Sequence, residues 1–261
     1  MEMRVSTKRW LRYEHDGKIA FGSLDDDTIT RHEGDMFAGA TPTGETVSIG
    51  AVRLLPPTEP TKMIALWNNF AALAAKLDLN TPEEPLYFIK GSNSFAAGGE
   101  VIRKPPSYDG RVVFEAELGI VIGKRCSGAS EAEAAEAIFG YTCINDVTAF
   151  DLLNKDPSFA QWTRAKSFDT FGVFGPVVAT GIDPETLTIR AVLNGEERQN
   201  YPAADMIFKP ARLVSLISQD MTLVPGDVIA CGTSLGTGKM KPGSTIDVSI
   251  DGIGTLSNRF E

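Results

Sequence analysis

Short apolar runs separated by turn residues dominate the pattern of hydrophobic and polar positions along this chain. Alternating residues at 9–13, a His-Asp-Gly turn at 15–17 and a second run at 19–22 predict an antiparallel hairpin near the N-terminus. Asn-Gly at 194–195 and Asp-Gly at 251–252 predict two more hairpins. Because hairpins join antiparallel strands, the pattern favours a mixed or antiparallel sheet over a doubly wound one.

The remaining periodic segments predict a β-rich α+β protein with few helices. Residues 112–123 form the longest strand candidate, and Ser130 with Glu133 forms a capping box that predicts a helix ending near Gly140. Further helices are expected at 70–79 and 212–220, and further strands at 63–66, 86–89, 141–144, 177–179, 187–193, 228–232 and 245–250.

The segment Leu54-Leu55-Pro56-Pro57 interrupts the pattern and suggests a domain boundary. We therefore expect a small N-terminal β domain over residues 1–57 and a larger domain over residues 58–261. A chain of 261 residues with 43% hydrophobic content is long enough to bury a core in this arrangement.

Composition excludes several classes of partner. A net charge of -9, with no run of lysine and arginine, argues against nucleic acid as a partner. No apolar stretch reaches the roughly 18 residues of a membrane span, and the N-terminus lacks the apolar segment of a secretory signal. The three cysteines are far apart in apolar surroundings, which is typical of core residues in a reducing cytoplasm.

Two glutamates interrupt the apolar run at 112–123. Glu115 and Glu117 are two residues apart, so in a strand both side chains leave the same face, with Cα atoms roughly 6.5 Å apart. Two ionised carboxylates in an apolar region repel each other, and a hard divalent cation would offset that cost. The spacing alone leaves two alternatives open, a metal site and a solvated strand face.

Two more residues are candidates for the same site. Asp146 follows an apolar run, as a third carboxylate would, although alone its position also suits an Asx turn or a helix N-cap. Lys166 is a candidate cation beside the carboxylates. Taken alone, it is also an ordinary loop lysine.

Several motifs together, in this order, resemble the fumarylacetoacetate hydrolase family over about residues 62–260. These motifs are FEAEL at 114–118, GYTCINDVTA at 140–149, AKSFDTF at 165–171, LVPGDVIACGT at 223–233, KPG at 241–243 and GIGTLSN at 252–258.

The resemblance implies a mixed β-roll fold, usually as a homodimer, and a family of enzymes that cleave, decarboxylate, hydrate or isomerise 2-oxo acids. It implies a Mg²⁺ or Mn²⁺ ion on Glu115, Glu117 and Asp146. It also implies that Lys166 contacts the substrate or a metal-bound water. By the same resemblance, the Gly232-Thr233 turn (residues 232–233) would donate to a substrate carboxylate.

The chain departs from the family where relatives carry a lid histidine and glutamate that activate water. Leu73 and Lys76 stand at those positions, and no histidine follows His32. Lys76 could act as a base if burial favoured its neutral form, and otherwise it is a solvated lysine on a lid helix. Phe150 replaces a family arginine, and with Asn69 it is expected to line the substrate pocket.

The sequence therefore predicts a divalent-metal enzyme acting on a small 2-oxo or enol acid by C–C cleavage, decarboxylation or keto–enol isomerisation. Hydrolysis through a lid dyad is disfavoured, because both dyad residues are replaced. The alternative is a non-catalytic protein that kept the fold and the metal but lost the chemistry.

Overall fold

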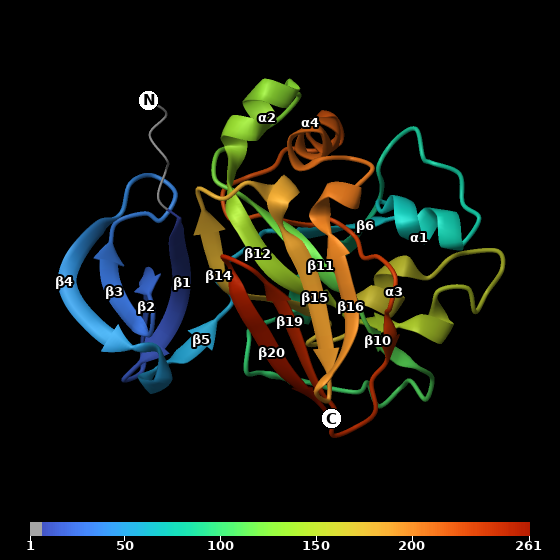
Figure 1. Ribbon diagram of the computed structural model, residues 1–261, viewed down its shortest axis with the longest axis horizontal. Helices are drawn as coiled ribbons and strands as arrows, with labels where there is room; N and C mark the ends of the chain where they lie inside the picture. The colour runs from blue at the N-terminus through green and yellow to red at the C-terminus, as the bar shows by residue number, and fades with distance from the viewer. Residues whose placement is uncertain (1–6) are drawn as a thin grey trace.

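A twelve-stranded mixed sheet, the central sheet, extends through the protein, which is described here over residues 7–261 from a computed structural model (Figure 1). β5 (Arg53–Leu55) pairs with β1 and β8 (Phe95–Ala96) pairs with β14. The other ten strands follow the order β4 (Thr41–Ser48), β3 (Thr28–Glu33), β2 (Lys18–Asp25), β1 (Lys8–His15), β14 (Gly172–Thr180), β12 (Ile138–Asp146), β11 (Ala116–Ile122), β17 (Val228–Ala230), β6 (Met63–Trp67) and β7 (Leu86–Lys90).

Two smaller sheets complete the β structure. The five-stranded sheet has the order β16 (Glu196–Pro202), β15 (Thr188–Leu193), β19 (Thr245–Ile250), β20 (Gly254–Phe260) and β9 (Val101–Ile102). The three-stranded sheet has the order β13 (Thr148–Ala149), β10 (Val112–Phe114) and β18 (Gly238–Lys239).

The main core lies between the central and five-stranded sheets. Leu118 and Ile120 of β11 share one buried cluster with Val248 of β19 and Leu256 of β20. Apolar positions on facing strands thus bury each other, which is the usual way for two sheets to form one core. A second apolar cluster, which includes Val121 and Phe174, covers the opposite face of the central sheet.

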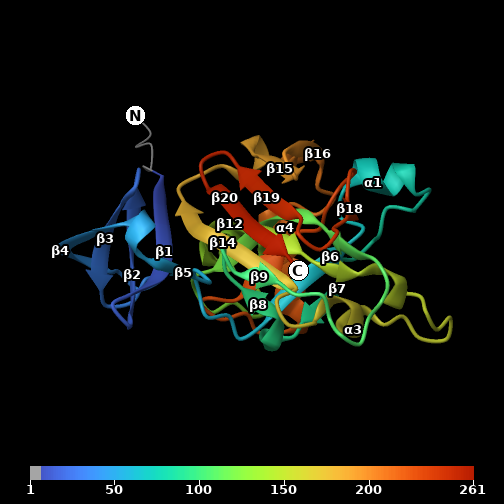
Figure 2. The ribbon, with the colours of Figure 1, turned by 90° about the horizontal axis from the view of Figure 1, so that it is seen from below.

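Four α-helices in the described part of the chain surround the sheets. α2 (Glu131–Ala137) packs against α4 (Pro210–Asp220), whereas α1 (Ala71–Lys76) and α3 (Trp162–Lys166) lie at the end of the molecule away from β1–β4 (Figures 1 and 2). Five short 3-10 helices occupy Ile49–Ala51, Ser92–Ser94, Phe150–Leu152, Pro184–Thr186 and Ala203–Asp205. No helix within residues 7–261 has the length and apolar character needed to cross a membrane.

The strands nearest the N-terminus form a lobe at one side of the molecule (Figure 2). This lobe is joined to the rest through β1, which pairs with β14 in the register Arg9↔Ala179. His32 of β3 is buried there at 4% exposure beside the Trp10 ring.

The expected β-rich architecture is confirmed. The 15–17, 194–195 and 251–252 turns connect antiparallel strands, and the parallel pair β17–β6 makes the central sheet mixed. The capping box is also present, since Ser130 Oγ accepts from Glu133 N at 3.3 Å. The helix after it ends at Ala137, earlier than expected, because β12 begins at the next residue.

Two further predicted elements are wrong in extent. The strand expected over 112–123 is two strands in different sheets, separated at Glu115. The helix expected over 70–79 is confined to α1, because Asp78 adopts a left-handed conformation with φ 54° that ends helical geometry.

Candidate metal centre

Three carboxylates meet where strands of the central sheet end. Glu117 lies in β11, Glu115 immediately precedes this strand, and Asp146 is the last residue of β12. The two strands are antiparallel neighbours, and Asp146 N donates to Glu115 O at 2.9 Å. One ligand atom from each of the three carboxylates can be chosen so that all lie within 4.8 Å of one another.

Two lysines face this cluster from elements distant in sequence. Lys166, the last residue of α3, donates from Nζ to Glu115 Oε2 at 2.8 Å and to Asp146 Oδ2 at 2.5 Å. Lys90, the last residue of β7, donates to the other oxygen of Asp146, Oδ1. Both lysine side chains are buried, at 3% and 0% exposure respectively. Asp146 is therefore held by an ammonium group on each side.

Burial and charge act in opposite directions on these groups. Burial would raise the pKa of Asp146, but Lys166 and Lys90 hold it below its ordinary value. Burial would lower the pKa of Lys166, but Asp146 and Glu115 hold it above its ordinary range. For Lys90, burial prevails over Asp146 and the pKa is lowered. Lys166 is consequently a firm cation in the cluster, suited to neutralising negative charge.

Glu117 is the least compensated of the three carboxylates. Its Oε2 accepts from Gly232 N at 2.7 Å, while its Oε1 is one of the buried polar atoms without a hydrogen-bond partner within residues 7–261. Burial, and then the charge of Asp146, raise the pKa of Glu117 well above its ordinary value. A buried oxygen left without a donor is costly, and a hard cation that prefers oxygen ligands would remove that cost. The residues present therefore fit a divalent metal ion.

Aromatic side chains form a wall beside Lys166. The Phe88 ring centroid lies 5.2 Å from Lys166 Nζ, and Trp162 stacks on Phe88 with centroids 5.2 Å apart. Trp67 packs against Trp162 with centroids 5.6 Å apart. All three rings are half-buried. Lys166 Nζ thus faces carboxylates on one side and an aromatic ring on another.

The two residues expected to donate to a substrate carboxylate are engaged within the protein. Gly232 N donates to Glu117, and Thr233 Oγ1 donates to Ala116 O at 2.9 Å. A substrate would have to compete with these bonds. The turn thus binds β11 in this structure, and its role towards a substrate stays a prediction.

The other residues expected near the substrate are placed differently from one another. Asn69 is buried at 1% exposure, and its amide contacts Cys231 O and Phe208 N at 2.8 Å each, so it joins backbone segments. Phe150 is 44% exposed, with the Arg111 guanidinium 4.5 Å above its ring. Lys76 is exposed at the end of α1 and lacks the burial that a neutral base requires.

Sequence reasoning overlooked Lys90 and Gln199. Lys90 ends an apolar strand, where a lysine usually reaches solvent, and Gln199 lies among charged residues in a hairpin. Gln199 is nonetheless completely buried and contacts Ala116, which lies between the two glutamates. The one sequence signal for the burial of Lys90 is that it is the only charged residue in the run at 86–90.

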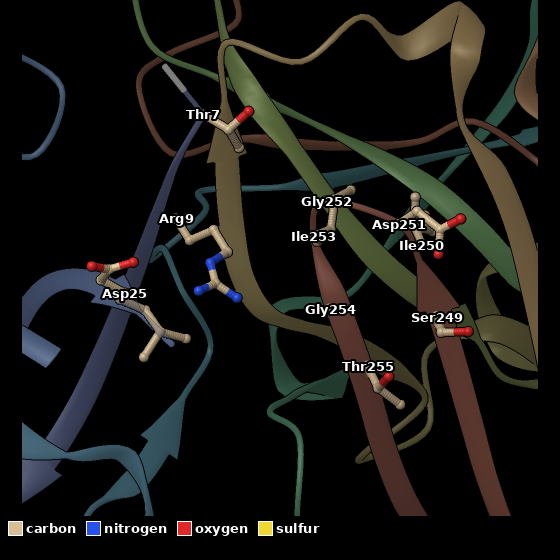
Figure 3. A pocket seen from close by; sticks show the side chains of 11 residues that line it. Thr7, Arg9, Asp25, Ser249, Ile250, Asp251, Gly252, Ile253, Gly254 and Thr255 are labelled. Carbon is tan, nitrogen blue, oxygen red and sulfur yellow. The ribbon is translucent and has the colours of Figure 1, made fainter. Parts of the chain in front are cut away.

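A separate groove of about 500 Å³ lies between the first strands and the β19–β20 turn (Figure 3). Arg9 and Asp25 line one side, and residues 249–255 line the other. None of the three carboxylates or the two buried lysines contributes to it. This groove is therefore separate from the carboxylate cluster.

Comparison with protein families gives two matches along the chain. The description "Fumarylacetoacetate (FAA) hydrolase C-terminal" matches residues 62–261, and "Rv2993c-like, N-terminal" matches residues 8–57. The first match contains both glutamates, the aspartate and both lysines.

Relatives of this chain are named for different reactions. Oxaloacetate tautomerase YisK of Bacillus subtilis is 35% identical over 82% of this chain and 74% of its own length. The bifunctional isomerase/decarboxylase of 4-hydroxyphenylacetate degradation of Salmonella dublin is 39% identical over 76% of this chain and 46% of its own length. The crystal structure of 2-hydroxyhepta-2,4-diene-1,7-dioate isomerase from Mycobacterium marinum is 35% identical, with a TM-score of 0.89 over 97% of this chain and 98% of that one.

Proposed function

Because this chain belongs to the fumarylacetoacetate hydrolase family, we propose that it is an enzyme that uses a divalent cation, Mg²⁺ or Mn²⁺, to transform a small 2-oxo or enol acid. The observation that carries the proposal is the convergence of Glu115, Glu117 and Asp146, whose ligand atoms lie within 4.8 Å. These three side chains would hold the ion, and a bound ion supplies a Lewis acid that stabilises the enolate of a 2-oxo acid.

The charges of the cluster support an anionic substrate. With all groups ionised, the three carboxylates and two buried lysines leave one net negative charge, so a divalent cation makes the site positive. Lys166 Nζ already bridges Glu115 and Asp146 and would lie beside an incoming carboxylate. An electrostatic partner held in place before the reaction stabilises developing negative charge without reorganisation.

Among the reactions of the family, we favour decarboxylation or keto–enol isomerisation over hydrolysis. Leu73 and Lys76 occupy the positions of the water-activating dyad, and Lys76 is solvent-exposed. The wall of Trp67, Phe88 and Trp162 gives the site apolar surface beside Lys166. Reactions that need chiefly charge stabilisation at the 2-oxo group depend less on an activated water.

A substrate panel tests the proposal. Protein with Mg²⁺ or Mn²⁺ is given oxaloacetate, acylpyruvates and ring-cleavage 2-oxo-dienoates, and enol formation, CO₂ release and C–C cleavage are followed separately. We expect turnover of at least one compound above the metal-only rate, lost in EDTA and in Glu115→Ala and Asp146→Ala. Full activity of EDTA-stripped protein would overturn the role of the metal.

The non-catalytic alternative gives a different result with the same panel. It predicts binding of these acids with no turnover above the metal-only rate. The replacement of both dyad residues favours this alternative. The buried lysines oppose it, because burying ionised groups is costly and a site with no chemistry would gain nothing from that cost.

We further propose a homodimer in the cytoplasm and a division of the chain into residues 1–57 and 58–261. The family resemblance supports the homodimer. The matches to residues 8–57 and 62–261 support the division of the chain. Light scattering coupled to size exclusion tests the oligomeric state. A monomer of 28.1 kDa at working concentration would contradict the homodimer.

A further inference from the structure

The peptide groups of Ala116 lie between the two glutamates of the candidate metal centre and are bound by side chains. Ala116 N donates to Gln199 Oε1 at 3.0 Å. Ala116 O accepts from Thr233 Oγ1 at 2.9 Å and also from the Tyr201 hydroxyl. Ala116 itself is completely buried, so these groups cannot turn to water instead.

These side-chain hydrogen bonds take the place of those that a neighbouring strand would make to Ala116. β11 pairs with β12 along its whole length, including Ala116↔Asn145, but it pairs with β17 only over Gly119–Val121 (residues 119–121). Beyond Leu118, whose carbonyl accepts from Cys231 N at 2.9 Å, the chain on that side leaves the sheet. The two glutamates therefore lie where the strand has lost backbone partners on one side.

Gln199 connects the strand to the turn that holds Glu117. Its Nε2 donates to Thr233 Oγ1 at 2.9 Å, Ser234 O at 3.1 Å and Leu235 O at 3.2 Å. The first residue of that turn, Gly232, donates to Glu117 Oε2 at 2.7 Å. One buried amide thus links the backbone between the glutamates to the segment that fixes one of them.

From this geometry, and resting on the proposed metal function, we infer that Gln199 is a positioning residue for the metal centre, with Tyr201 in a supporting role. By holding the Ala116 peptide, Gln199 sets the directions of Glu115 and Glu117 and so tunes the affinity for the cation. Within residues 7–261 it makes no hydrogen bond to either carboxylate, so its effect passes through Ala116 and the turn at residues 232–233. Groups that hydrogen-bond directly to metal ligands typically change metal affinity roughly 10- to 100-fold when they are removed, and we take this range as the upper bound for Gln199.

The two side chains should differ in importance. Gln199 is the acceptor for Ala116 N, so Gln199→Met leaves that donor buried without its partner. Tyr201→Phe removes one of two donors to Ala116 O and keeps the ring that packs edge-on against Phe70 at 5.0 Å. We therefore expect Gln199→Met to weaken cation binding by up to about 10- to 100-fold, and Tyr201→Phe to weaken it less.

Mn²⁺ titration followed by electron paramagnetic resonance tests this inference without a substrate. The binding constant and the spectrum of the bound ion are compared with the free energy of unfolding of each metal-free variant. Asn200→Met is the matched surface control, because Asn200 is the exposed neighbour on the same strand. Asn258→Leu is the buried control, because its amide donates to Ala97 O and Glu100 O at 2.8 Å each and its loss should lower stability alone.

We expect weaker binding and an altered Mn²⁺ spectrum in Gln199→Met, and wild-type binding in both controls. Equal affinity and an unchanged spectrum in folded Gln199→Met would overturn the positioning role while leaving the metal site intact. If Asn258→Leu weakened binding as much, the effect would be one of general stability and the inference would also fall. Failure of the wild-type protein to bind Mn²⁺ would instead refute the proposed function itself.

Discussion

Lys166 Nζ donates to Asp146 Oδ2 at 2.5 Å, and the two side chains are only 3% and 1% exposed. A buried ion pair of this kind is not in itself a source of stability, because removing both groups from water costs about as much as their attraction returns. The ion pair keeps the Lys166 ammonium group beside the carboxylates. Removing only one of its two charges should nevertheless lower the free energy of unfolding, because the other charge stays buried without its partner.

The first prediction concerns Asp146→Asn in metal-free protein. Lys90 loses its carboxylate partner and Lys166 loses one of two, so we expect the free energy of unfolding to fall by about 3–5 kcal/mol. Urea denaturation in EDTA measures this. The exposed pair Arg190–Asp251 provides the control, since Asp251→Asn should cost no more than about 1 kcal/mol. Equal losses of stability in the two variants would show that the buried Lys90 and Lys166 do not need the Asp146 carboxylate as a partner.

The second prediction concerns the loop that leads from Thr233 to β18. Gly236 has φ +97°, and an added Cβ would lie 2.0 Å from Arg198 O, which is backbone and cannot easily move. Gly243 has φ +89° with open space around it. Both alanine variants carry the left-handed cost of about 1–2 kcal/mol, and Gly236→Ala should lose about 1–3 kcal/mol more from the clash. Similar denaturation midpoints for the two would contradict the close packing of this loop on β16.

The site shows what local sequence could and could not predict. Glu115, Glu117 and Asp146 are apparent because carboxylates are unusual in apolar runs, and the structure places them together. The break at Glu115 was not apparent, because the residues around it have uniform β-strand character. That break follows from which strands lie alongside, a relationship between segments more than eighty residues apart, as the Ala116–Gln199 bond shows.

The same reasoning explains the other differences. The hairpins were predictable because two turn residues determine each, and Asn194 and Gly195 have the positive φ values, 53° and 82°, that such turns require. The burial of Lys90 and His32 was not predictable, because it depends on partners from distant segments, here Asp146 and Trp10. Local pattern thus predicted elements well and polar burial poorly.

The third prediction concerns the capping box of α2. Hydrogen bonds from the Ser130 hydroxyl and backbone N–H lower the pKa of Glu133. A carboxyl with a depressed folded pKa contributes stability above its unfolded pKa, about 4.3, and loses it as pH falls through the folded value. The stability difference between wild type and Glu133→Ala should therefore shrink as pH falls through this range.

Thermal melts across this pH range measure the difference, and Ser130→Ala serves as the paired control. With the hydroxyl partner removed, the pH-dependent contribution of Glu133 should be smaller. A difference that stays constant with pH in both backgrounds would mean that the box does not depend on an ionised Glu133.

The fourth prediction concerns the three cysteines, which are free and buried in the part of the chain that the structure describes. Burial raises the pKa of Cys143 and of Cys231 above the ordinary thiol value, so little thiolate forms at neutral pH. We expect negligible reaction with a chromogenic disulfide reagent in the native protein and three thiols after unfolding. Rapid native reaction of one or more would contradict the packed core around them.

The central claim is that Glu115, Glu117 and Asp146 together bind one divalent cation that receives a 2-oxo acid. The most direct measurement is anomalous X-ray diffraction from a crystal grown with Mn²⁺ and oxalate, a stable mimic of the enolate of a 2-oxo acid. We expect one strong anomalous peak per chain in contact with all three carboxylates, with oxalate bound to the same ion. A crystal with Mn²⁺ bound elsewhere and none in contact with these three carboxylates would contradict the account.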